Sequence, residues 1–105
     1  MEQPNKSYIY SLSEGDKTFE KKLIDIIQKE FPQEKKTYYD SITVGDYKKT
    51  AEIVHKLKHK ISILGLEKSY EDAIAFENNL LDGNNKLQHK FESILTTITN
   101  YLYQL

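Results

Sequence analysis

Near the middle of this 105-residue chain, two imidazoles, an ammonium and a hydroxyl recur at helical spacing. They belong to His55, Lys58, His59 and Ser62. Residues three and four apart are neighbours on a helix, so these side chains share one face. Imidazole titrates close to neutral pH, and its neutral form carries a lone pair that can attack an electrophile. The pattern therefore indicates a nucleophilic imidazole with a positive charge one helical turn away.

An amphipathic helix is expected to position these groups. Its apolar stripe recurs at steps of four and three residues and consists of Thr50, Val54, Leu57, Ile61 and Leu64. At about 100° per residue, His55 lies roughly 130° from the middle of that stripe, so it should face water. Gly65 is typical of a left-handed helix cap, and Leu66 should fold back onto Ile61.

The stretch resembles the signature of histidine phosphotransfer (HPt) domains, in which an exposed His precedes x-Leu-Lys-Gly and a further Gly follows. The matching residues are His55, Leu57, Lys58, Leu64 and Gly65. His59 departs from the pattern, because the family usually has Gly there. Gly45-Asp46 and Phe76-Glu77 resemble the family's Gly-Asp and Leu-Glu positions, and the likeness covers roughly Leu12 to the C-terminus.

The resemblance implies a phosphoryl carrier rather than an enzyme. His55 would be the phosphoacceptor, Lys58 would stabilise the phosphoryl group, and His59 and Ser62 would flank it. The partner would be a response-regulator receiver domain or a hybrid histidine kinase, which would supply the metal and the catalytic groups. No cofactor is expected on this chain, which has no phosphate-binding loop of the P-loop type.

Three further residues of the same helix are candidates for partner docking. Lys56 and Lys60, together with Lys48 and Lys49, concentrate positive charge that either steers an acidic receiver or merely solvates an outer face. Ile63 projects away from the apolar stripe and would offer an apolar contact.

A metal site was the alternative for the two histidines. His55 and His59 form an i,i+4 pair of the kind that binds zinc. The metalloprotease version requires Glu after the first His, where Lys56 stands, and His89 is too distant in sequence to count as a third ligand. We therefore expect no metal.

Composition narrows the expected partners and location of the protein further. The net charge of −1 argues against nucleic acid as a main partner. The chain has no Cys, no apolar run near the ~20 residues that span a bilayer and no apolar core after a basic start at its N-terminus. A cytoplasmic monomer without membrane contact is the expectation.

The predicted fold is all-α: an antiparallel up-down four-helix bundle with an additional N-terminal helix. The four bundle helices are expected at 33–44, 47–64, 67–81 and 85–104, with a turn at 82–85. Leu81 and Leu105 belong to the apolar stripes expected for the last two helices. The additional helix is expected at 17–31, with Asp16 as N-cap, and Pro32 should end or kink it. It would either cover one end of the bundle or continue, kinked, into the next helix. Residues 1–12 are expected to be an irregular arm whose aromatic residues pack on a domain of residues 13–105.

Two other functions remain open at this stage. A degenerate HPt module would dock a receiver without cycling phosphate, and the unusual His59 favours it. A structural bundle with unrelated partners would make the match at His55 a coincidence.

Overall fold

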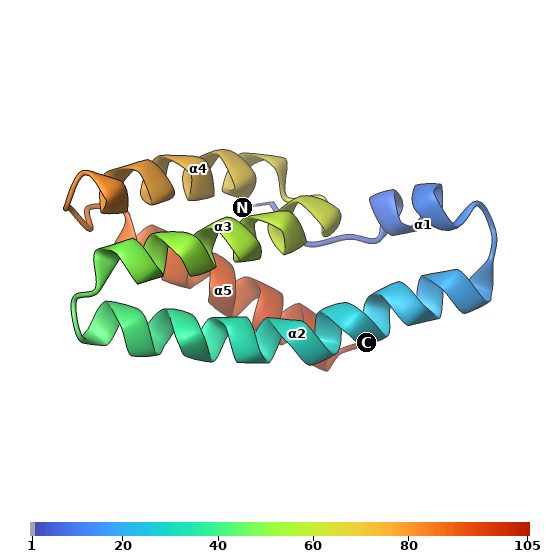
Figure 1. The fold of residues 1–105 in the computed structure, drawn as a ribbon. Coiled ribbons are helices and arrows are strands. Elements are labelled where there is room, and N and C mark those ends of the chain that lie inside the picture. The colour runs from blue at the N-terminus through green and yellow to red at the C-terminus, as the bar shows by residue number, and fades with distance from the viewer. Residues whose placement is uncertain (1) are drawn as a thin grey trace.

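The computed structural model describes residues 2–105, which contain five helices and no strand (Figure 1). The helices are α1 (Ser7–Ser13), α2 (Lys17–Thr43), α3 (Tyr47–Ile63), α4 (Glu67–Leu81) and α5 (Gln88–Tyr103). The predicted all-α class is confirmed. From α2 to α5, successive helices run in opposite directions along a molecule of 44 × 23 × 19 Å.

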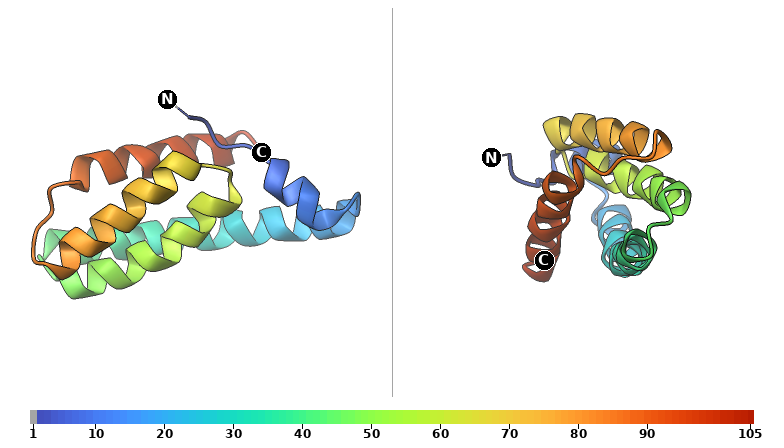
Figure 2. Two further views of the ribbon diagram at one scale, coloured as in Figure 1. Left: turned by 90° about the horizontal axis from the view of Figure 1, so that it is seen from above. Right: turned by 90° about the vertical axis from the view of Figure 1, so that its left-hand side faces the viewer.

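The helices surround one hydrophobic core. In the end-on view of Figure 2, α4, α3 and α2 follow one another on one side and α5 stands on the other. Tyr38, Phe76 and Phe91 are buried where α2, α4 and α5 meet, and their ring centroids lie 5.1–6.4 Å apart. Such aromatic pairs add to the free energy gained by burying apolar surface. No helix of residues 2–105 is both long and apolar enough to cross a membrane.

The helix that carries the candidate site forms as its sequence predicts. Every residue of the α3 stripe is at most 1% exposed. The helix ends at Ile63, and Gly65, whose φ is +78°, forms the left-handed cap just beyond it. There the Gly65 N–H donates to the Ser62 carbonyl and the Leu66 N–H donates to the Ile61 carbonyl. Leu66 and Ile61 are both buried in the core, as predicted.

Of the two arrangements expected for residues 17–44, a separate helix at 17–31 is not found. One helix of 27 residues runs from Lys17 to Thr43 with Pro32 inside it. Pro32 removes one helical hydrogen bond, but Phe31 and Tyr38, on either side of it, are buried in the same core. Burial of both segments outweighs the local preference to end the helix. The N-cap prediction is confirmed, since Asp16 accepts from the Thr18 and Phe19 N–H groups.

The expected irregular arm also differs from the structure. Residues 7–13 form α1, whose Ile9 is fully buried, whereas the neighbouring Tyr8 and Tyr10 are each 49% exposed. The aliphatic side chain therefore anchors this helix rather than the aromatic ones. The Asn5 N–H donates to the Leu64 carbonyl at 2.8 Å, which ties the segment before α1 to the end of α3.

Glu2 completes the N-terminus of α4. That helix has no side-chain cap of its own, and the Glu2 carboxylate accepts from the backbone N–H groups of Ser69 and Lys68. Burial by itself would raise the pKa of Glu2, but these hydrogen bonds outweigh it and lower that pKa below its ordinary value.

The last two predicted helices need smaller adjustments. Helix α4 spans the predicted residues, and α5 begins at Gln88, three residues later than expected, after the predicted turn at 82–85. Two apolar residues assigned to helical stripes point outward instead: Leu81 is 62% exposed and Leu105 is 44% exposed.

Candidate functional site

His55 stands on the outer side of α3. Its side chain is 54% exposed, because the stripe of α3 that includes Val54 and Leu57 turns inward on either side of it. The prediction that His55 faces water is confirmed. Since its neighbours are fixed in the core, the imidazole is presented from a rigid base.

Glu77 of α4 holds one nitrogen of this imidazole. His55 Nδ1 lies 3.2 Å from Glu77 Oε2. A carboxylate beside Nδ1 favours the tautomer that has its proton there, which leaves the Nε2 lone pair free. Phe76, next to Glu77, is fully buried and fixes this part of α4. Glu77 therefore fixes the orientation of the imidazole through Nδ1, and the other ring nitrogen, Nε2, is available as a nucleophile.

The other oxygen of Glu77 binds Lys58. Lys58 Nζ donates to Glu77 Oε1 at 2.9 Å and lies 5.9 Å from the centroid of the Tyr70 ring. The Lys58 side chain is only 12% exposed. The sequence predicts this ammonium on the face of His55, and the structure adds that it is already paired with a carboxylate of α4. Glu77 thus joins the imidazole and the ammonium in one cluster.

His59 and Ser62 lie along the same face. The ring of His59 meets that of His55 edge to face, with centroids 5.2 Å apart, and both residues are exposed. Ser62 is also exposed, about two helical turns beyond His55. His59 thus lies directly beside His55, whereas Ser62 lies further along the same face.

Lys60 does not lie where a docking residue should. Its side chain is 10% exposed, and its ammonium donates to Glu30 at 2.9 Å and to Glu34 at 3.1 Å, both on α2. The expectation of a solvated cation at this position was wrong, because α3 packs on α2 along this face. Ile63 is partly buried against the core rather than projecting into water, which corrects the second docking expectation.

A shallow hollow beside His55 is more accessible to a partner than the surface at Lys60 and Ile63. It is lined by Lys48, Ala51, Glu52, His55, Lys56, Glu77 and Leu81. Lys56, the third predicted docking residue, is exposed here. Leu81 adds an exposed apolar side chain, although its helical spacing predicts a place in the apolar stripe. The sequence contained no signal for it, since its spacing also fits the buried stripe of α4.

The described residues also bear on the metal alternative. Within residues 2–105, no three His, Cys, Asp or Glu side chains are grouped closely enough to hold a metal ion.

Comparisons of this chain with models of protein families, with characterised proteins and with solved structures gave no match. The geometry of His55, Glu77 and Lys58 therefore carries the functional inference.

Proposed function

We propose that this chain is a histidine phosphotransfer protein, in which helices α2 to α5 form an antiparallel four-helix bundle that presents His55. It would carry a phosphoryl group on His55 between aspartates of receiver domains. The observation that supports this most is the contact of His55 Nδ1 with Glu77 Oε2 at 3.2 Å, on a side chain that is 54% exposed and whose Nε2 has no hydrogen-bond partner among residues 2–105.

The transfer step follows from this arrangement. The Nε2 lone pair attacks the phosphorus of an aspartyl phosphate, an N–P bond forms, and the P–O bond to the aspartate breaks so that its carboxylate leaves. The imidazole becomes positively charged while Nδ1 keeps its proton. The Glu77 carboxylate beside Nδ1 stabilises that charge, as the carboxylate of a catalytic triad does. The reverse step delivers the phosphoryl group to the next aspartate.

Lys58 has a role that differs from simple phosphate binding. Its ammonium offsets the charge of Glu77 while His55 is unmodified. A phosphoryl group on His55 would add negative charge on the same face, one helical turn away, and would compete with Glu77 for that ammonium. Lys58 would therefore be shared between the carboxylate and the phosphoryl group.

The receiver would dock over the hollow beside His55. Exposed Lys48 and Lys56 supply positive charge for an acidic receiver surface, and the exposed Leu81 supplies an apolar contact. Lys60 and Ile63 are no longer part of this proposal.

A transfer assay tests the function. A phosphorylated receiver domain is incubated with the wild-type chain and with His55→Gln, which keeps a polar side chain of similar reach but has no nucleophilic ring nitrogen. We expect acid-labile label on the wild type and none on the variant. His89→Gln is the matched control, because His89 is exposed on α5 and should not affect labelling.

Other outcomes separate the alternatives. Equal labelling of wild type and His55→Gln would end the assignment. Receiver binding without labelling of either protein would favour a module that only docks. Absence of any interaction across a panel of receivers would favour a structural bundle.

A further inference from the structure

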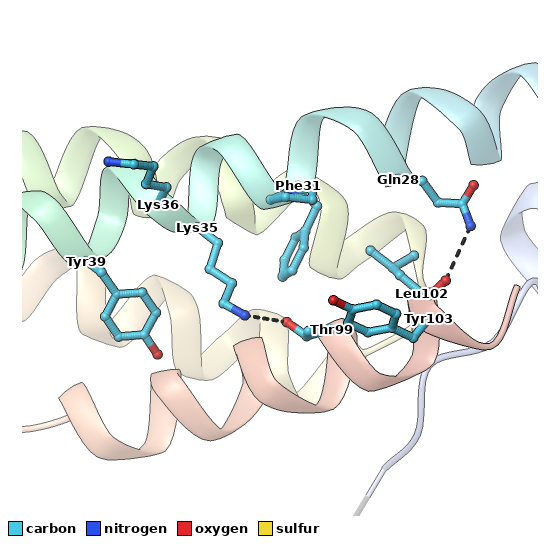
Figure 3. Close-up of a pocket in the computed structure, with 9 residues that line it drawn as sticks. Gln28, Phe31, Lys35, Lys36, Tyr39, Thr99, Leu102 and Tyr103 are labelled. Atoms are coloured by element: carbon cyan, nitrogen blue, oxygen red, sulfur yellow. Dashed lines mark hydrogen bonds between the residues drawn. The ribbon is translucent and has the colours of Figure 1, made fainter.

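A groove between α2 and α5 is separate from the histidine site. It encloses about 400 Å³ and is shown in Figure 3. It is lined by Gln28, Phe31, Pro32, Lys35, Lys36, Tyr39, Thr99, Leu102 and Tyr103. Its volume lies within the range of small-molecule sites, ~300–1,000 Å³, and like those sites it has mostly apolar walls with a few polar groups. The site at His55, by contrast, involves α3 and α4.

Apolar side chains form much of this groove. The Phe31 ring points from α2 toward α5, and Leu102 and Tyr103 face it from α5 (Figure 3). The Gln28 side-chain amide donates to the Leu102 carbonyl at 3.3 Å and links the two helices at one end. The apolar part of the groove therefore suits a hydrocarbon or aromatic body.

One ammonium in the groove lacks a carboxylate partner. Lys35 Nζ donates to Thr99 Oγ1 at 2.8 Å, and no carboxylate among residues 2–105 lies within ion-pair distance of it. The neighbouring Lys36 differs, because its ammonium is paired with Asp40 at 2.7 Å. A half-buried ammonium that has only a hydroxyl partner leaves room for an anion.

Tyr39 adds a neutral hydrogen-bond donor to this wall. Burial, and then the nearby Glu92 carboxylate, raise the pKa of the Tyr39 phenol, so the hydroxyl stays protonated over the ordinary pH range. A single ammonium and a neutral phenol match a monoanion better than a doubly charged phosphate.

We propose that this groove binds a small amphipathic carboxylate, with its apolar body against Phe31 and Leu102 and its carboxylate on Lys35. Charge complementarity selects this occupant: the groove has one unpaired cation beside apolar walls. A neutral hydrocarbon would leave that cation unmatched.

Decanoate is a suitable probe, used below its micelle concentration with the full chain and followed by amide NMR shifts. We expect saturable shifts confined to α2 and α5 around Phe31, Lys35 and Thr99. Decanol, which has the same chain length without the charge, should bind about tenfold more weakly, the scale of one charge-assisted hydrogen bond.

Two variants assign the effect to Lys35. Lys35→Met should reduce decanoate affinity about tenfold, to that of decanol, and Lys36→Met should leave it within about twofold, because the Lys36 charge is already paired. Thr99→Val removes the hydroxyl that now engages Lys35 and should preserve or increase decanoate affinity. It also shows whether a loss in Lys35→Met comes from the charge or from the broken contact between α2 and α5.

The proposal is overturned if decanoate causes no saturable shift at millimolar concentration, or if Lys35→Met, shown to be folded by circular dichroism, binds decanoate as the wild type does. Shifts of the groove amides that depend on protein concentration without ligand would also overturn it, since they would mean that a second copy covers the groove. Because His55 is remote from this groove, His55→Gln should bind decanoate normally, and the outcome is independent of the phosphotransfer assay.

Discussion

Two lysines of α3, two positions apart, each bind glutamate on a neighbouring helix, yet only one shares its glutamate with an exposed imidazole. Lys58 binds Glu77 of α4, and Lys60 binds Glu30 and Glu34 of α2. The two lysine side chains are almost equally covered, at 12% and 10% exposure. Ion pairing and burial therefore do not distinguish the two clusters.

The difference lies in the third member of each cluster. At Glu77 it is the imidazole of His55, which is 54% exposed and keeps one nitrogen open. At Lys60 it is a second carboxylate, and Glu34 Oε1 is buried there without a hydrogen-bond partner. One cluster orients a nucleophile toward solvent, whereas the other fastens α3 to α2. The two ion pairs thus differ in whether their shared carboxylate also contacts an exposed imidazole.

The largest expected effect is a loss of stability when Lys60, which joins α3 to α2, is replaced. Lys60→Met leaves the carboxylates of Glu30 and Glu34 without their cation, and we expect the free energy of unfolding to fall by about 3 kcal/mol. Urea denaturation measures this. Lys29→Met, at an exposed position of α2, is the control and should change stability by less than about 0.5 kcal/mol.

Phosphotransfer per folded molecule should survive the Lys60 substitution. If Lys60→Met removed transfer while the protein remained folded, the cluster on α2 would have a functional role and the comparison would fail.

A smaller effect, on rate, is expected at the other cluster. Glu77→Gln keeps an acceptor for Nδ1 but removes the negative charge that stabilises the imidazolium, so transfer should slow by about tenfold, which corresponds to about 1.4 kcal/mol. Single-turnover transfer from a phosphorylated receiver measures the rate. Glu71→Gln, at an exposed carboxylate of the same helix, is the matched control. An unchanged rate in Glu77→Gln would show that Glu77 is as purely structural as Glu34.

The smallest effect concerns Glu2, a carboxylate that caps α4 and touches neither cluster. Its pKa is lowered in the folded chain, so its contribution to stability is complete above the ordinary glutamate pKa of 4.5 and is lost as the pH falls below that value. Glu2→Gln should reduce stability by less than about 1 kcal/mol at neutral pH and by almost nothing near about pH 3. Urea denaturation at both pH values checks this, and an equal loss at both would rule out the charge of Glu2 as the cause.

Local pattern was sufficient for much of the helix that presents His55. The stripe from Thr50 to Leu64, the outward direction of His55 and the cap at Gly65 depend on residues within a few turns of one another. Periodicity and capping chemistry describe such short-range relations well, so these predictions are confirmed.

Side-chain contacts between different helices could not be predicted from the sequence. The resemblance marked the position of Glu77, but its contacts with His55 and Lys58 depend on how α4 packs on α3. The burial of Lys60 likewise depends on carboxylates of α2. The local rule for Pro32 left open whether the helix ends there or continues, and the core shared by both sides of Pro32 decides for one continuous helix.

The central claim is that Glu77 engages Nδ1 of His55 and leaves Nε2 to accept the phosphoryl group. The most direct measurement is to phosphorylate the chain with a phosphorylated receiver domain, locate the label by mass spectrometry and identify the phosphohistidine isomer by NMR. We expect phosphate on His55 at Nε2. Phosphate on Nδ1 of His55, or on His59 or His89 in its place, would contradict it.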